Sequence, residues 1–148
     1  MIKIPKDLKK KMYDYETFYH LSMTNDRLGK FLAHYEAFKL ISEIPGEIVE
    51  CGVFKGTSFV RFALFRELLG GENSSRLIAF DVFSDNYPNT SYKEDKAQRE
   101  FWIRTAGGSS IGSNQLKKIL NEKKIKNFQL IPGDVLKTIP NFKKKNPG

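Results

Sequence analysis

Residues 48–56, which read Ile-Val-Glu-Cys-Gly-Val-Phe-Lys-Gly, decide the fold class of this chain. Ile48 and Val49 favour a β-strand, two glycines follow, and residues 57–69 have the apolar content of a buried helix. Strand, glycine turn and helix in this order predict the first unit of a nucleotide-binding α/β domain. The pattern E-x-G-x-x-x-G differs from the dinucleotide fingerprint G-x-G-x-x-G, because Phe54 stands where the middle glycine would be.

The glycine turn has the chemistry of a ligand site. Gly52 allows a tight turn and leaves room where a Cβ would intrude on a ligand. The helix that follows presents unpaired N–H groups and the positive end of its dipole at the same place. The alternative for Gly52 and Gly56 is an ordinary strand-to-helix turn without a ligand, so the later strands must decide.

Two further predicted strands also end close to acids. Residues 77–80 form an uninterrupted apolar run, which is typical of a strand buried on both faces of a parallel sheet, and Asp81 ends it. Residues 128–131 form the third strand, and Asp134 follows it after a Pro-Gly pair. An acid at the end of the second strand commonly binds ribose hydroxyls, which we predict for Asp81. The alternative is an aspartate that caps a helix or a turn.

The remaining chain predicts helices and connections. Thr24 or Asn25 can cap a helix, whose apolar face recurs at three- and four-residue steps from Leu28 to Ile41 and which Pro45-Gly46 ends. Trp102, on a helix expected through about residue 105, is interpreted as a core residue, with a platform for the cofactor as the alternative. Residues 107–112 either approach an adenine ring or form a plain linker. Further helices are expected at 113–124 and, for one or two turns at most, at 135–142.

Composition favours one soluble domain. The chain has 148 residues, 40% of them apolar, and it carries a formal net charge of +8. Lysine runs hold the excess charge, and we interpret them as solvated surface rather than as a nucleic-acid or membrane site. The single cysteine fits a reducing, cytoplasmic location, and no stretch is long enough to span a membrane. His20 and His34 lack the ligand spacing of a metal site, so none is predicted.

We divide the chain into three parts. Residues 1–23 are a basic and aromatic arm, whose rings either pack onto the domain or close over a ligand. Residues 24–142 form the ligand-binding domain, and residues 143–148 form a basic tail.

These motifs together resemble those of class I S-adenosylmethionine-dependent methyltransferases. Residues 45–53, the Asp81-Val82-Phe83 run on to Pro88, and Gly133-Asp134-Val135 are similar to the macrocin O-methyltransferase family, which methylates sugar hydroxyls. The resemblance covers residues from about 20 to 142. It implies a Rossmann-like three-layer α/β/α sandwich with parallel strands, and S-adenosyl-L-methionine as the cofactor.

The resemblance also assigns roles. Glu50 and Gly52 would line the methionine and ribose side of the cofactor, and Gly56 and Thr57 would lie where the helix N-terminus meets it. Asp81 would accept hydrogen bonds from the ribose hydroxyls, and Asp134 would lie near the adenine amino group. The implied function is transfer of a methyl group to a hydroxyl of a sugar or another small molecule.

The sequence departs from the family after the third strand. The family's metal-binding and catalytic acids follow later strands, so no catalytic residue is assigned here, and a divalent metal is expected only in a full-length protein. We therefore expect a fold truncated after the third strand, with the far edge of the first strand bare. An exposed strand edge invites pairing, which predicts self-association through the first strand.

Two other functions stay open at this stage. A module that binds the cofactor without catalysing transfer is the main alternative, because the expected catalytic half is missing. A basic nucleic-acid-binding domain is disfavoured, because the aromatic residues mostly occupy helix-periodic core positions rather than alternating with lysines.

Overall fold

The computed structural model describes residues 1–70, 75–85 and 92–146. Contacts within the chain divide it into two units, one of residues 3–45 and one of residues 1–2 with 46–148. This division does not coincide with the boundary predicted after residue 23, since the first two helices belong together. Pro88, part of the motif behind the resemblance, lies outside the described residues, as does the end of the expected tail.

The smaller unit consists of two helices, α1 (Met12–Ser22) and α2 (Asn25–Ile41). Thr24 precedes α2 in an extended conformation, so α2 begins where the sequence predicts. All residues of α1 are described and none is buried, and α2 buries Phe38 alone among its described residues. The rings of Tyr13 and Phe18 are exposed.

The larger unit is built on a three-stranded parallel sheet. Its strands are β1 (Ile48–Cys51), β2 (Leu77–Asp81) and β3 (Phe128–Pro132), in the order β1-β2-β3. Every residue of β2 is buried, because this strand has a neighbour on both edges and helices over both faces. The uninterrupted apolar run of β2 is therefore explained, and the predicted α/β class is confirmed.

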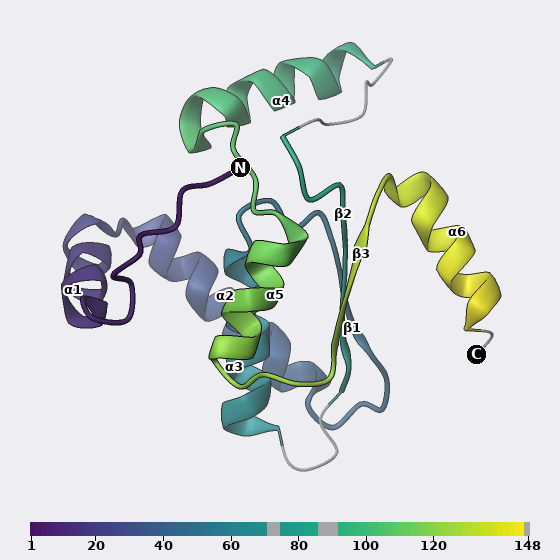
Figure 1. The fold of residues 1–148 in the computed structure, drawn as a ribbon, viewed down its shortest axis with the longest axis horizontal. Helices are drawn as coiled ribbons and strands as arrows, with labels where there is room; N and C mark the ends of the chain where they lie inside the picture. Colours follow the sequence, from purple (N-terminus) through teal and green to yellow (C-terminus); the bar gives the residue numbers. More distant parts are fainter. Residues whose placement is uncertain (71–74, 86–91, 147–148) are drawn as a thin grey trace. The chain divides into compact units, whose positions relative to one another are not determined.

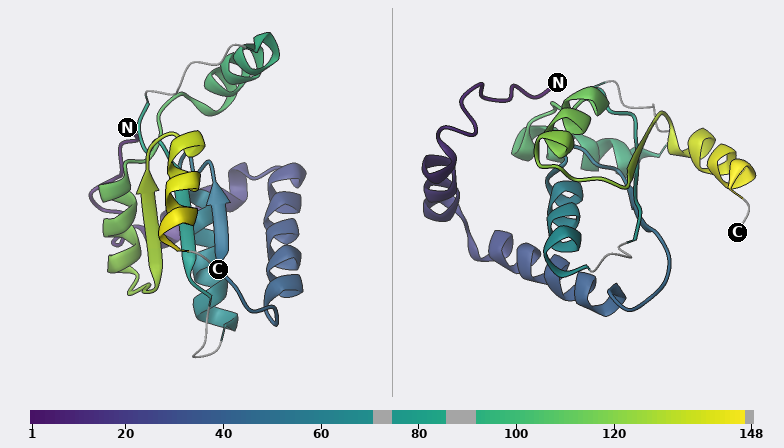
Figure 2. Two further views of the ribbon diagram at one scale, coloured as in Figure 1. Left: turned by 90° about the vertical axis from the view of Figure 1, so that its right-hand side faces the viewer. Right: turned by 60° about the horizontal axis from the view of Figure 1, so that its bottom comes forward.

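Helices cover both faces of this sheet (Figure 1, Figure 2). One face carries α3 (Thr57–Leu69) and α5 (Ser113–Glu122), and the other carries α6 (Val135–Lys145). The buried apolar residues of the unit come from the strands, α3, α5 and the connections before and after them: Val53, Phe59, Ala63, Phe65, Leu77, Ile78, Ala79, Phe80, Phe83, Ile111, Leu116, Leu120 and Ile125. This is the predicted three-layer, Rossmann-like arrangement.

The length of α6 differs from the prediction. One or two turns were expected, but α6 runs for 11 residues and includes three of the lysines assigned to the tail. Pro140 lies inside it, and a proline there removes one helical hydrogen bond. Tertiary packing supports the helix, because the ring of Phe142 lies edge-on to that of Phe80 in β2, with 5.5 Å between centroids.

The helix α4 (Lys93–Ala106) also departs from expectation. It is a helix, as predicted, but all its residues are described and none is buried. Trp102 is 51% exposed, so its interpretation as a core residue is wrong. Burial of an aromatic side chain depends on what covers the helix, which helical periodicity cannot specify.

The connections between the strands cross one face of the sheet. The β1–α3–β2 and β2–α5–β3 connections pass over this face and lead from β1 toward β3. In open α/β sheets, ligands bind outside the carboxyl ends of the strands, where the loops after β1, β2 and β3 begin.

A buried arginine forms hydrogen bonds with the segments that precede β2 and β3. Arg66, near the end of α3, is 2% exposed. Its guanidinium donates to the carbonyl oxygens of Ser75 (3.1 Å), Asn127 (2.8 Å) and Lys126, and it pairs with Glu67 at 2.8 Å. This cluster joins α3 to the segments that enter β2 and β3, and it lies at the end of the sheet opposite the glycine turn.

Candidate functional site

The loops that follow the three strands meet at the end of the sheet where the carboxyl ends of the strands lie. The strand register places Cys51 beside Phe80, and Asp81 beside Pro132. The Gly52 amide donates to the carbonyl oxygen of Phe80 at 2.9 Å, and the Gly133 amide donates to the Asp81 carbonyl at 2.9 Å. The segments that sequence reasoning selected separately are therefore held side by side by backbone hydrogen bonds.

Every second residue of the glycine turn between β1 and α3, from Gly52 to Gly56, has a left-handed backbone conformation. Gly52, Phe54 and Gly56 have φ angles of 88°, 52° and 81°. A Cβ built on Gly56 would lie 3.3 Å from the Leu116 side chain and 3.5 Å from that of Ile111. A Cβ built on Gly52 would meet no atom within 4 Å. Gly56 thus allows close packing against α5, whereas Gly52 borders open space.

Glu50 and the start of α3 supply polar groups on the side of the sheet covered by α3. The Glu50 side chain is half-buried, and its Oε1 accepts a hydrogen bond of 2.5 Å from the Ser58 hydroxyl. Thr57 is the first residue of α3, and no side chain caps this helix at Gly56. The first-turn amides are among the groups that a helix cannot satisfy internally. An acid and helix-terminal donors are therefore adjacent.

Asp81 is the most tightly held of the predicted site residues. It is 6% exposed, and its carboxylate accepts hydrogen bonds from the backbone amides of Val53 (2.5 Å), Phe54 (3.0 Å) and Phe83 (2.7 Å). These donors come from the turn after β1 and the turn after β2 itself. A ribose contact for Asp81 stays a prediction, but most acceptor positions of this carboxylate are already used.

Asp134 begins α6. Its Oδ1 accepts a hydrogen bond of 3.0 Å from the Leu136 amide, which is a helix-capping contact. The side chain is half-buried, and its neighbour Gly133 is the residue bonded to Asp81. A contact of Asp134 with an adenine amino group stays a prediction.

The segment between α4 and α5 lies against the glycine turn with buried residues, whereas its approach to an adenine ring stays a prediction. Ser110 is completely buried, and Ile111 is 2% exposed. The Ile111 amide donates to the Phe54 carbonyl at 2.8 Å. Lys55 adds a second connection, because its ammonium donates to the Ala106 carbonyl at the end of α4.

Asp85, which follows β2, is a polar residue bonded to this segment, and sequence reasoning missed it. Its Oδ1 accepts from the Ser110 amide at 2.7 Å, and its Oδ2 pairs with the terminal ammonium of Met1. The ammonium, and then the amide, hold the pKa of Asp85 below its usual range. The one feature of the sequence that could have pointed to Asp85 is that it is a second acid shortly after the end of β2.

The described part of the chain was also compared with the requirements of a metal cluster and of a membrane-spanning helix. Among residues 1–70, 75–85 and 92–146, no three His, Cys, Asp or Glu side chains are grouped as metal ligands. The helices in those ranges are all too short or too polar to cross a membrane.

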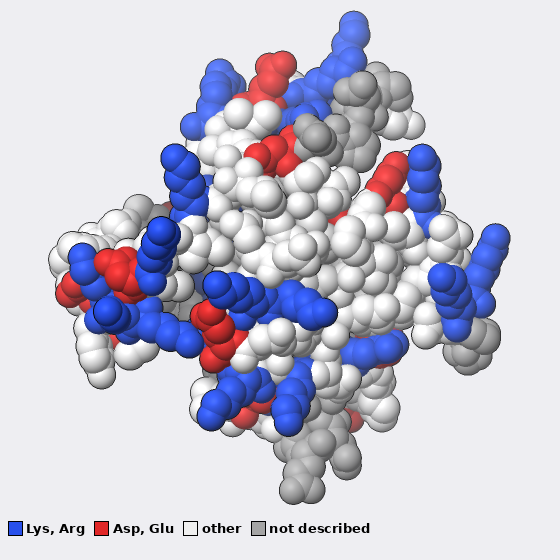
Figure 3. Space-filling model, in the orientation of Figure 1, with Lys and Arg blue, Asp and Glu red and all other residues white. Residues whose placement is uncertain are grey.

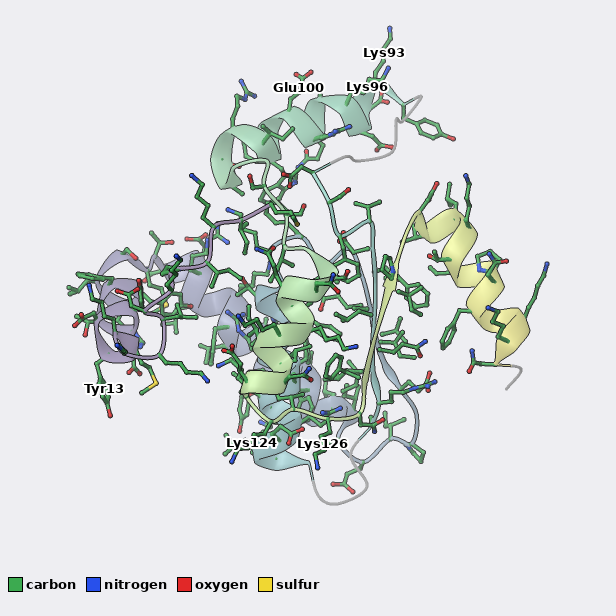
Figure 4. All side chains as sticks on the ribbon, viewed as in Figure 1. Tyr13, Lys93, Lys96, Glu100, Lys124 and Lys126 are labelled. Atoms are coloured by element: carbon green, nitrogen blue, oxygen red, sulfur yellow. The ribbon has the colours of Figure 1, made fainter. Side chains whose placement is uncertain are left out.

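The exposed charges are dispersed. On the face drawn in Figure 3, Lys and Arg side chains are interspersed with Asp and Glu. Figure 4 places Lys124 and Lys126 at the amino ends of the strands, away from the glycine turn. It also shows Lys93, Lys96 and Glu100 projecting from the outer side of α4.

Comparison with known proteins identifies the fold. No protein-family model matches the sequence, and no curated protein matches it. The crystal structure of CalS11, a calicheamicin methyltransferase, superposes with a TM-score of 0.67 and 21% identity, over 99% of this chain and 57% of CalS11. The apo structure of CalS11, described as TDP-rhamnose 3′-O-methyltransferase, gives 0.56 and 20%, over 99% of this chain and 55% of CalS11.

The likeness confirms the predicted fold class. This chain shares the Rossmann-like fold of CalS11, and it spans little more than half the length of CalS11. At this level of identity the likeness shows the fold.

Proposed function

We propose that this chain forms the cofactor-binding part of an S-adenosylmethionine-dependent O-methyltransferase. The observation that carries the proposal is the meeting of the glycine turn, Asp81 and Gly133-Asp134 at one edge of a parallel sheet. The superposition with CalS11 over 99% of the chain supports it.

The residues at this edge fit the cofactor. When bound, S-adenosylmethionine supplies an electrophilic methyl group on a sulfonium cation, beside an amino-acid tail with both charges. Glu50 and Asp134 suit the cationic and donor groups, and the first-turn amides of α3 suit the carboxylate. The open space beside Gly52, which any Cβ would enter, gives the cofactor room to pass over the turn.

The chain's own residues prepare this surface before any ligand arrives. Ser58 fixes the direction of the Glu50 carboxylate, and the left-handed Gly56 turns the backbone so that α3 begins at the site. Ile111 holds the turn from the side through the Phe54 carbonyl. A preformed surface lowers the ordering cost of binding.

A sugar hydroxyl is the proposed acceptor. The motifs at residues 45–53, 81–83 and 133–135 resemble the macrocin O-methyltransferase family, and CalS11 is described as acting on TDP-rhamnose. Transfer requires the acceptor oxygen in line with the methyl group, and a base or metal that makes the oxygen more reactive. We assign neither of these to a residue of this chain.

A second candidate is a module that binds the cofactor without transferring its methyl group. The site described above accounts for it as well, because no residue of this chain is assigned to the transfer step. The two candidates share the same site and differ only in turnover.

Two measurements test the proposal. Isothermal titration with S-adenosylhomocysteine should show saturable binding to this chain, whereas NADH should not bind, because Phe54 replaces the middle glycine of the dinucleotide pattern. Incubation with methyl-labelled cofactor and nucleotide-linked sugars then separates the candidates. Binding with transfer supports the enzyme, binding alone supports the non-catalytic module, and no binding refutes both.

A further inference from the structure

The carboxylate of Asp81 joins two turns that are distant in sequence. Its Oδ2 receives the amides of Val53 and Phe54, and its Oδ1 receives the amide of Phe83. An ionised carboxylate has about four acceptor positions, so three of them are directed at the protein's own backbone. At 6% exposure, little of Asp81 is open to a ligand.

Two of the three donors belong to residues in an unfavourable conformation. Phe54 and Phe83 have φ angles of 52° and 51°, in the left-handed region that residues with a side chain rarely adopt. Such conformations persist where the surroundings impose them, and they cluster at functional sites. Hydrogen bonds to a charged acceptor are among the stronger ones available to a backbone amide. Asp81 therefore imposes the backbone conformation on both sides of the site.

The backbone of Asp81 extends this connection to the third loop. Its carbonyl oxygen accepts the Gly133 amide at 2.9 Å, beside the predicted adenine contact at Asp134. One residue thus contacts the loops that follow β1, β2 and β3.

We propose that Asp81 is a positioning residue, which fixes the glycine turn in its ligand-binding conformation, and that it does not bind the ribose hydroxyls itself. This inference rests on the proposed function, because it specifies how the same site is built. It replaces the direct ribose contact predicted from the sequence with an indirect role through the turn.

The decisive experiment compares two ligands on two proteins. Isothermal titration measures S-adenosylhomocysteine and its 2′,3′-dideoxy analogue, which lacks both ribose hydroxyls, against the parent chain and Asp81→Asn. A positioning role predicts that the variant weakens both ligands by the same factor, about tenfold or more, so the ratio of the two Kd values is unchanged. A direct contact predicts loss for the hydroxyl-bearing ligand only, and this result would overturn the inference.

A second variant tests the imposed conformation. Phe54→Gly removes the side chain that disfavours the left-handed backbone, so Asp81→Asn should weaken binding less in this background than in the parent. Equal losses in the two backgrounds would contradict the proposal. A residue needed only for overall stability would not couple to Phe54 in this way.

Hydrogen exchange on the unmodified chain gives a readout that needs neither a variant nor a ligand. The amides of Val53, Phe54 and Phe83 should exchange slowly, because each donates to a buried carboxylate. Exchange at the rate of an unfolded chain would show that Asp81 does not hold these amides. If the parent binds no S-adenosylhomocysteine, the proposed function and the ligand-directed role fail together. The exchange measurement still decides whether the Asp81 carboxylate holds the two turns.

Discussion

Replacement of Gly52 by alanine should separate ligand binding from stability. The φ angle of Gly52 is 88°, a region in which an L-residue costs roughly 1–2 kcal/mol. A Cβ at this position meets no atom within 4 Å, so no steric term is added. For a chain of about 150 residues, this loss lowers Tm by roughly 2–8 °C. The Gly52→Ala variant should therefore still fold.

Binding should suffer much more than folding. The added methyl group occupies the open space over the turn, where we propose that the cofactor passes, so affinity for S-adenosylhomocysteine should fall at least tenfold, which corresponds to about 1.4 kcal/mol. Isothermal titration measures the affinity, and thermal unfolding followed by circular dichroism measures the stability of the same samples.

Gly46→Ala is the matched control. Gly46 also has a positive φ, of 144°, and open space around its Cβ position, but it precedes β1 and so lies at the other end of that strand. This variant should lose a similar amount of stability and bind the ligand as the parent does. Unchanged affinity in a folded Gly52→Ala variant would refute the proposed path of the cofactor over Gly52. Equal losses of affinity in both variants would show that strain alone weakens binding.

Three other predictions concern the rest of the larger unit. Arg66→Met should lower the free energy of unfolding by roughly 3 kcal/mol, because three carbonyl groups lose their donor. Chemical denaturation measures this loss, and it should show little change for the control Arg104→Met, an exposed position on α4. The lowered pKa of Asp85 means that its contribution to stability is present above the unfolded value near 3.9 and is lost as the pH falls through the lower folded value. The protection factor of the amide bound to Asp85, measured by hydrogen exchange, should therefore fall in that acid range, and Asp85→Asn should abolish this pH dependence. We also propose that the chain self-associates through the exposed edge of β1. Replacement of Val49, which is 53% exposed on that strand, by lysine should abolish association, whereas Leu68→Lys on α3 should not. Light scattering that finds only monomer in the parent chain at high concentration would refute this proposal.

Local patterns predicted most of the elements correctly. The helix at 57–69 has the bounds of α3, and the apolar run at 77–80 forms the buried strand β2. These features depend on short-range preferences: β-favouring residues, a glycine turn and helical periodicity. The parallel order of the sheet followed from the alternation of strands and helices.

The errors concern what covers each element. Trp102 was expected in the core but is exposed, and residues 107–112 could not be distinguished from a linker although Ser110 and Ile111 are buried. The length of α6 was underestimated, because packing of Phe142 on Phe80 supports a helix that continues past Pro140 into the lysines of the expected tail.

The sequence by itself determined where the chain forms strands, helices and a glycine turn, and which acids follow the strands, because those properties belong to neighbouring residues. Only the tertiary structure decided which atoms the acids contact. Asp81 meets amides 27 and 28 residues away in the chain, and Arg66 meets carbonyls about 60 residues away. Such contacts arise when the strands take their register, so no local pattern could show that Asp81 is directed at the backbone.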